Sequence, residues 1–372
     1  MPSLASDWLN PDPWLARARS AGKNDVRRAL SAESPGIAEF ASLLSEEAGK
    51  DPERLAENAR LITRRRFGRT VSLYAPLYLS DFCENGCLYC GFAADRQRTR
   101  TRLEHNEAVM EMDAIQAMGF DEILLLTGDC TSRADFNYVR ECVTSAAERF
   151  NPVTVEVFPM SETEYRALAE SGCMGVTIYQ ETYDRDIYEK MHRWGPKRNF
   201  AFRLETPERA LAAGMRNVGM GVLLGLADPI RDALALFQHV QILRKTYWRS
   251  GVSVSFPRVR PQLGGFNPPF PVDDAFLFQM ICAWRICQND LHLALSTREP
   301  PPLRDRLAGV WISKMSVASR TTVGGYHHES AEEGQFSVSD NRPIREFCEM
   351  LKSKGLAPVF KNWDAAFREK AP

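Results

Sequence analysis

The chain has 372 residues, of which 44% are hydrophobic and 26% charged, a composition typical of a globular protein. Its 47 lysines and arginines nearly balance its 48 aspartates and glutamates, which does not indicate a general nucleic-acid or membrane-surface binder. The N-terminal residues do not combine a basic start with an apolar stretch, and no apolar run has membrane-spanning length. We therefore expect a cytoplasmic protein.

Residues 1–70 predict short amphipathic helices, most clearly at 51–65, where Leu55, Ala59 and Leu61 follow near-helical spacing. From residue 71 onward, short β-like runs alternate with helical ones such as 103–118 and 231–247, and a last helix is predicted at 345–354. The predicted strands are 71–79, 122–127, 153–158, 175–179, 218–224, 252–256, 291–296 and 316–319.

This alternation predicts an α/β fold, either a (β/α)8 TIM-type barrel or a doubly wound open sheet. Polar residues at or just beyond the predicted strand ends favour the barrel, because barrel enzymes assemble their active sites there; they are Cys83, Asp129, Glu181, Arg258, Arg298 and Ser319. We expect three parts: an N-terminal helical extension over 1–70, the barrel over 71–322 and a C-terminal cap over 323–372.

Three cysteines directly follow the first predicted strand. Cys83, Cys87 and Cys90 are spaced Cys-x3-Cys-x2-Cys, so one loop can wrap three thiolates around one centre of soft metal. Structural zinc sites and most electron-transfer clusters take four protein ligands. A cubane held by three cysteines instead leaves one iron open to bind another molecule.

Two other interpretations of the triplet are weaker. The chain has nine cysteines, an odd number, which does not favour a disulfide framework. A zinc site would need a distant fourth ligand, and His105 and Cys130 carry no recognisable pairing. The remaining cysteines considered are interpreted as small buried residues: Cys142, Cys173, Cys282 and Cys348.

The cysteine spacing, with Tyr89 just before the third cysteine, resembles the radical S-adenosylmethionine (SAM) enzymes. The resemblance implies a 4Fe–4S cluster on Cys83, Cys87 and Cys90, with Tyr89 near the cofactor. In that superfamily the open iron chelates the amino and carboxylate groups of SAM. An electron from the cluster then splits SAM into methionine and a 5′-deoxyadenosyl radical.

Longer stretches resemble one family of this superfamily, the tyrosine lyases of thiamine thiazole biosynthesis (2-iminoacetate synthases). The resemblance extends from about residue 8 to 363 and is carried by residues 126–129, 179–182, 203–206, 254–261, 295–299 and 324–326. It implies cleavage of L-tyrosine between Cα and Cβ to 2-iminoacetate (dehydroglycine) and p-cresol. It also implies two partners, a thiazole synthase that receives the product and a reduced flavodoxin or ferredoxin that supplies the electron.

The same resemblance suggests the substrate site. Arg298 can bind the substrate carboxylate bidentately, although it could instead form a structural ion pair with Glu299 or Asp305. Tyr78 resembles a substrate-contacting tyrosine of aromatic amino-acid lyases, with a buried core tyrosine as the alternative. Ser316 and Ser319 could hydrogen-bond the substrate amine.

For SAM, Gly128 and Asp129 stand where the superfamily usually carries Gly-Glu to receive the methionine amine. Asp129 is one methylene shorter, so either the backbone closes the gap or a backbone carbonyl takes the contact. Glu181 and Arg203 resemble the pair that contacts the SAM ribose or amine and the carboxylate. They could instead pair with each other as part of the scaffold.

Three alternative functions are open. The tyrosine lyase of hydrogenase maturation carries an extra domain with a second cysteine cluster, whereas only Cys348 lies beyond residue 290 here. A tryptophan lyase would differ in the shape of the pocket. A non-catalytic iron–sulfur carrier would need neither an open iron nor SAM contacts.

Overall fold

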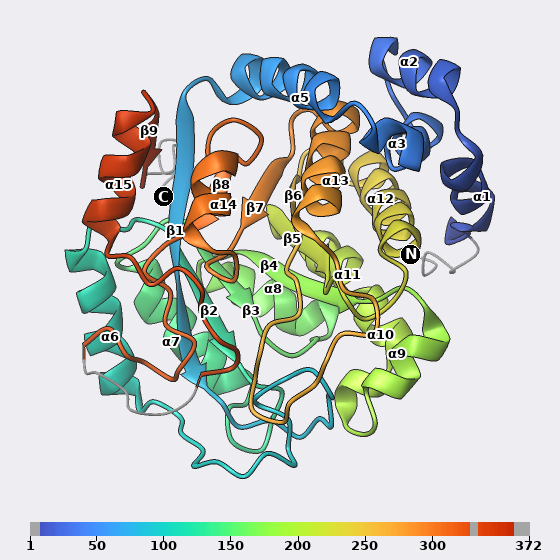
Figure 1. Ribbon diagram of the computed structural model, residues 1–372. Helices are drawn as coiled ribbons and strands as arrows, with labels where there is room; N and C mark the ends of the chain where they lie inside the picture. Colours follow the sequence, from blue (N-terminus) through green and yellow to red (C-terminus); the bar gives the residue numbers. More distant parts are fainter. Residues whose placement is uncertain (1–7, 328–333, 361–372) are drawn as a thin grey trace.

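The computed structural model of the protein describes residues 8–327 and 334–360, and within them one sheet dominates the fold (Figure 1). Its strand order runs from β2 through β8 to β1, and β1 pairs again with β2, so eight parallel strands close into a barrel. The predicted (β/α)8 barrel is thereby confirmed. The strands are β1 Thr70–Ser80, β2 Ile123–Thr127, β3 Val153–Glu156, β4 Cys173–Glu181, β5 Asn217–Val222, β6 Gly251–Ser255, β7 His292–Leu295 and β8 Lys314–Ser316.

Helices cover the outside of the barrel, as parallel strands buried on both faces require (Figure 1). Between the strands lie α6 His105–Ala117, α7 Phe136–Ala147, α8 Glu162–Glu170, α9 Arg185–Met191, α10 Phe200–Leu204, α11 Thr206–Ala212, α12 Pro229–Thr246, α13 Asp274–Cys287 and α14 Pro301–Leu307. A 3-10 turn at Pro196–Arg198 precedes α10.

Helices also precede β1, as the sequence predicts: α1 Asp12–Ser20, α2 Lys23–Ser31, α3 Ile37–Leu43, α4 Glu46–Gly49 and α5 Pro52–Phe67. They pack on the outer helices of the barrel through a buried aromatic cluster. The Phe40 ring stacks on Phe237 at 4.3 Å and meets Trp284 edge-on at 5.1 Å, between ring centroids. Such pairs add about 0.5–1.5 kcal/mol each beyond the burial of their apolar area. The helical extension therefore shares a hydrophobic core with the outer helices of the barrel.

Two differences from the predicted elements concern the end of the chain. The eighth strand is Lys314–Ser316 rather than 316–319, because the backbone turns away at Ala318, where φ is 52°. After α15 (Ile344–Ser353), a ninth strand, β9 (Ala357–Val359), pairs in parallel with the first residues of β1. Its three residues are too few to show a strand alternation in the sequence.

Alternate strand residues point into the barrel, and many of them are polar. On β3, Val153 and Val155 are buried in the hydrophobic core, whereas Thr154 and Glu156 line two cavities inside the barrel. One cavity lies at the carboxyl ends of the strands and the other at their amino ends, and Tyr74 and Tyr179 border both.

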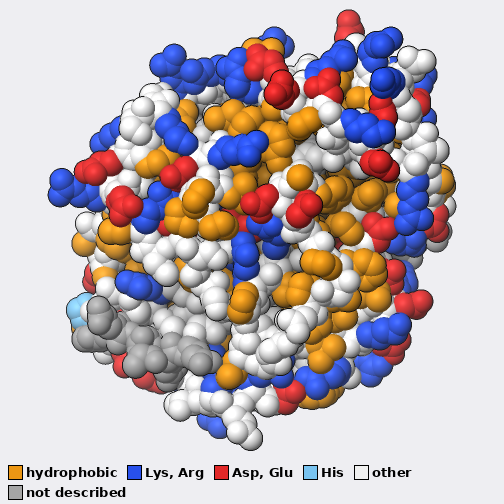
Figure 2. Space-filling view, in the orientation of Figure 1, with side chains coloured by type: hydrophobic (Ala, Val, Ile, Leu, Met, Phe, Trp, Pro, Cys, Tyr) orange, Lys and Arg blue, Asp and Glu red, His pale blue; other side chains and the backbone are white. Residues whose placement is uncertain are grey.

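The surface carries no dominant charge on the face drawn in Figure 2, where basic and acidic side chains are interspersed. Among residues 8–327 and 334–360, no helix has the length and apolar character needed to cross a bilayer.

Candidate active site

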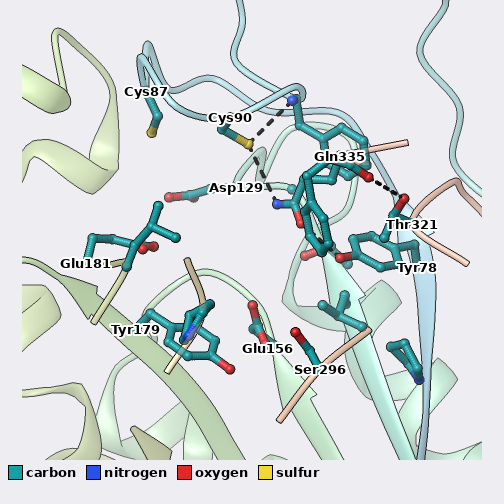
Figure 3. Close-up of a pocket in the computed structure, with 18 of the residues that line it drawn as sticks. Tyr78, Cys87, Cys90, Asp129, Glu156, Tyr179, Glu181, Ser296, Thr321 and Gln335 are labelled. Atoms are coloured by element: carbon teal, nitrogen blue, oxygen red, sulfur yellow. Dashed lines mark hydrogen bonds between the residues drawn. The ribbon is translucent and has the colours of Figure 1, made fainter. Parts of the chain in front are cut away.

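The cavity at the carboxyl ends of the strands collects every site residue predicted from the sequence. It has about 1360 Å³ of empty space, including its open mouth, which is room for a cofactor together with an amino acid. Figure 3 shows Cys87 and Cys90 at one end, Glu156 and Ser296 at the other, and Asp129 and Glu181 between them. The predicted residues that line it are Tyr78, Cys83, Cys87, Tyr89, Cys90, Gly128, Asp129, Glu181, Arg203, Arg298, Ser316 and Ser319.

The cysteine loop leaves β1 and is held by side chains that the sequence analysis did not identify. Asn85 Nδ2 lies 3.7 Å from Cys83 Sγ, and Gln335 Nε2 lies 3.6 Å from Cys90 Sγ. The Phe92 amide also donates to Cys90 Sγ at 3.4 Å. Donors aimed at two of the three sulfurs suit thiolates, which accept hydrogen bonds.

The donor set fits an iron–sulfur cubane better than a single ion. In the part of the chain that the structure describes, no three His, Cys, Asp or Glu side chains come together closely enough to hold one metal ion. A cubane needs no such approach, because each cysteine binds a different iron. Burial raises the pKa of the Cys83 and Cys87 thiols, so deprotonation requires a positive partner such as iron.

Two glycines let other segments approach this loop closely. A Cβ on Gly128 would lie 2.2 Å from the Phe82 carbonyl oxygen and 3.2 Å from Cys83 Cβ. A Cβ on Gly91 would lie 2.5 Å from the Gln335 carbonyl oxygen. The first contact seats the loop on the end of β2, and the second seats it against the segment 334–340.

Asp129 lies beside the cysteine loop, bound to it at two points. Its carboxylate accepts a hydrogen bond from Asn85 Nδ2 at 2.9 Å, and its carbonyl accepts one from the Glu84 amide at 2.9 Å. Burial raises the pKa of Asp129, and the Asn85 hydrogen bond opposes this shift. Its second carboxylate oxygen is left for a ligand, so the shorter side chain is compatible with the predicted contact to the SAM amine.

Glu181 forms an ion pair that the sequence did not reveal. Lys197 Nζ lies 2.5 Å from Glu181 Oε1, whereas Arg203 Nη2 is 3.6 Å away and donates through Nε to the Tyr179 carbonyl at 2.7 Å. Glu181 adopts φ 70°, a left-handed conformation in which a residue other than glycine is uncommon. The scaffold pairing considered from sequence is thus present, and it orders both charges at the cavity wall.

Tyr89 is fixed by a buried histidine. Its hydroxyl lies 2.7 Å from His192 Nε2, and His192 Nδ1 lies 2.7 Å from the Tyr188 carbonyl oxygen. Burial, helped by Lys197, lowers the pKa of His192 to about 2, so the ring is neutral. The carbonyl can only accept, which places the proton on Nδ1 and makes Nε2 the acceptor of the Tyr89 hydroxyl.

Arg298 has no carboxylate partner among the described residues. Both alternatives considered from sequence bind elsewhere: Glu299 accepts from Arg258 and Arg260, and Asp305 accepts from Arg342. The alternative considered from sequence, a structural ion pair of Arg298, is therefore not found among the described residues, and Arg258 at the rim is part of the scaffold. The Arg298 guanidinium carbon instead lies 3.3 Å from the centre of the Phe336 ring.

The other predicted substrate contacts lie in the same cavity. Tyr78 is 4% exposed and donates its hydroxyl to Gln335 Oε1 at 2.8 Å, so it belongs both to the core and to the cavity wall. Ser316 Oγ accepts from the Thr297 amide at 3.3 Å. The buried Ser319 hydroxyl has no partner among the described residues, which leaves it available to a ligand.

Sequence analysis missed Asn85, Lys197, Gln335 and Glu156, all of which line the cavity. The alternation of the run 153–156, with an apolar residue at each odd position, could have identified Glu156 as pointing inward. Asn85 lies within the cysteine loop, but nothing local marks Lys197 or Gln335, which reach the site from segments distant in sequence.

Comparison with known proteins agrees with this geometry. The Radical SAM superfamily model matches residues 77–239, and the Biotin and Thiamin Synthesis associated domain matches residues 255–357. Over 368 residues the chain is 40% identical to the 2-iminoacetate synthase of Escherichia coli (strain K12), with 98% of each chain covered.

Solved structures support the same grouping. The crystal structure of HydG, a maturase of the FeFe-hydrogenase, has a TM-score of 0.91 at 28% identity, covering 97% of this chain and 82% of that one. HydG from Carboxydothermus hydrogenoformans has a TM-score of 0.85 at 31% identity, covering 97% and 83%. The chain therefore belongs to the 2-iminoacetate synthase family of radical SAM lyases, whose cofactors are a 4Fe–4S cluster and SAM.

Proposed function

We propose that this protein cleaves the Cα–Cβ bond of L-tyrosine to 2-iminoacetate and p-cresol, for synthesis of the thiamine thiazole ring. One observation supports this more than any other. A single cavity is lined by three cysteines and by an arginine that lacks a carboxylate partner among the described residues. This arrangement suits a cluster and SAM beside an amino-acid substrate.

In this proposal, Cys83, Cys87 and Cys90 hold the cluster, and SAM lies against Tyr89, Gly128, Asp129, Glu181 and Arg203. When bound, these cofactors supply a radical that removes a hydrogen atom from the substrate amino group. Tyr89 and Glu181 need no rearrangement to serve as walls, because His192 and Lys197 already fix them. Preorganised walls of this kind hold reacting atoms at a reproducible distance.

Arg298 binds the substrate carboxylate through its guanidinium fork, and stacking on Phe336 fixes the plane of that fork. The unpartnered Ser319 hydroxyl contacts the amine, with Ser316 beside it at the end of β8. Tyr78 bounds the substrate from β1. These buried walls exclude water and competing hydrogen donors from the reactive centre.

The proposal includes the partners implied by the chemistry. Dehydroglycine hydrolyses readily, so direct transfer to a thiazole synthase avoids loss of the product. A reduced flavodoxin or ferredoxin provides the electron. We also propose that residues 71–322 form the catalytic barrel, with 1–70 as an extension and 323–372 as a cap; residues 1–7, 328–333 and 361–372 lie outside the described part of the chain.

The deciding experiment is an anaerobic assay of the reconstituted protein with SAM, dithionite and L-tyrosine. The proposal expects 5′-deoxyadenosine together with p-cresol and glyoxylate, the hydrolysis product of dehydroglycine. Formation of deoxyadenosine without p-cresol would keep the radical mechanism but indicate another substrate, such as tryptophan. An intact, reducible cluster that yields no deoxyadenosine would favour a non-catalytic carrier.

A further inference from the structure

Glu156 is a half-buried acid that lines the cavity, and the proposed function gives it no role. It is the last residue of β3 and lines the cavity at the end away from Cys87 and Cys90 (Figure 3). Across the described part of the chain, its carboxylate has neither a hydrogen-bond donor nor an ion-pair partner. A carboxylate that lines a cavity without a protein partner is a candidate for binding a ligand.

Arg298 lines the same cavity and also lacks an ion-pair partner among the described residues, but it carries the opposite charge. Both side chains line one cavity and attract each other electrostatically, yet they form no ion pair. A cation and an anion that face one space without meeting are complementary to a zwitterion. The α-carboxylate of an amino acid would bind Arg298, and its ammonium group would lie toward Glu156.

We propose that Glu156 binds the ammonium group of the substrate and accepts one of its protons before the radical step. One N–H bond breaks heterolytically, its electron pair stays on nitrogen, and the proton forms an O–H bond with Glu156. The products of this transfer are a neutral amine and a neutral carboxylic acid, so no oxidant or reductant is needed. The inference rests on the proposed function, in which hydrogen is removed from the amino group.

The surroundings of Glu156 support a base of this kind. Burial, helped by the charge of Glu181, raises the pKa of Glu156 to about 7, while cations in the cavity oppose the shift. A carboxylate with such a pKa takes a proton from an ammonium group more readily than an ordinary glutamate does. The ionisable groups that act on Glu156 from β1, β4 and the segments after β4 and β7 are Tyr74, Tyr78, Tyr179, Glu181, Lys197, Arg203 and Arg298.

The charge of Glu156 favours the amine over the phenol of tyrosine. A phenol is neutral and needs only a neutral acceptor, whereas a nearby cation stabilises the charged form of a carboxylate. An ammonium group supplies both the charge and the proton. If Glu156 instead bound the phenol, its removal would change the preference for tyrosine over L-phenylalanine.

The test is the binding preference of cluster-loaded, SAM-bound protein without reductant, measured for three ligands. These are L-tyrosine, 3-(4-hydroxyphenyl)propanoate, which lacks the amine, and L-phenylalanine, which lacks the hydroxyl. We expect Glu156→Gln to reduce the preference for tyrosine over the deamino analogue by at least about tenfold. Glu156→Asp, which keeps a carboxylate, should retain part of that preference, and Glu170→Gln, at an exposed position, should retain all of it.

Turnover gives a second readout. Loss of a general base predicts a fall of about 100-fold or more in p-cresol formation by Glu156→Gln, with cluster content and SAM affinity unchanged. The assignment would be overturned if Glu156→Gln kept the preference for tyrosine over the deamino analogue. It would also be overturned if the variant lost only the preference for tyrosine over L-phenylalanine. If the wild-type protein itself forms no p-cresol, the proposed function fails, whereas failure confined to the variant rejects only the role of Glu156.

Discussion

The guanidinium carbon of Arg298 lies 3.3 Å from the centre of the Phe336 ring. Arg298 follows β7, whereas Phe336 belongs to a segment after β8 that also lines the cavity. The neighbouring Gln335 ties this segment to Tyr78 and to Cys90. The C-terminal segment is therefore a wall of the active site and connects its substrate end to its cluster end.

Phe336→Ala should weaken tyrosine binding without removing the cluster. Stacking on an aromatic ring contributes about 0.5–2 kcal/mol, so the affinity for tyrosine should fall roughly two- to thirty-fold. Calorimetry or the KM of p-cresol formation measures this, and iron content serves as the check on the cluster. Phe336→Tyr keeps a ring and should remain near wild type; an equal loss in both variants would count against the stacking argument.

Arg298→Ala should abolish the use of tyrosine while the protein keeps its cluster and still binds SAM. Truncating one partner of a buried charge pair costs about 2–5 kcal/mol, which predicts a loss of about 30-fold or more in kcat/KM. The measurement is p-cresol formation, accompanied by iron content and SAM binding. A variant that lost the cluster as well would show that Arg298 holds the structure rather than the substrate.

Gly128→Ala should impair the cluster site rather than the fold. Its Cβ would lie 2.2 Å from the Phe82 carbonyl oxygen, so the cysteine loop would have to move off the end of β2. We expect less iron and sulfide per chain after anaerobic reconstitution, with far-ultraviolet circular dichroism unchanged. Gly22→Ala is the matched control, because a Cβ there meets nothing within 4 Å and its φ of −102° suits alanine. Full iron loading of Gly128→Ala would refute the steric argument.

Local patterns in the sequence predict much of this site, but not the distant segments that complete its walls. Strand periodicity locates β1 to β7, and the cysteine spacing with the residues after each strand identifies Cys83, Asp129 and Arg298. These signals are local, because a strand and the loop after it are contiguous. Gln335 and Lys197 reach the cavity through contacts distant in sequence, and three-residue β9 is too short for an alternation, so no local signal marks them.

Glu156→Gln should stabilise the protein much more at pH 8 than at pH 5. Burial raises the pKa of Glu156 from 4.5 to about 7, so the folded state binds this proton more tightly than the unfolded state. The contribution of Glu156 to stability is therefore full below pH 4.5 and is lost as the pH rises through 7, by about 3 kcal/mol in total. Glutamine cannot ionise, and it avoids this loss.

The measurement is the apparent Tm of the cluster-loaded, substrate-free protein at both pH values, for wild type and variant. The gain in Tm for Glu156→Gln should be about fourfold smaller at pH 5 than at pH 8, because only the first part of the loss between pH 4.5 and 7 has occurred at pH 5. Glu170→Gln, at an exposed position, controls for the removal of one negative charge. A gain of the same size at both pH values would mean that packing, not ionisation, causes it. Stability gained together with activity lost would show that the carboxylate of Glu156 is retained for its function.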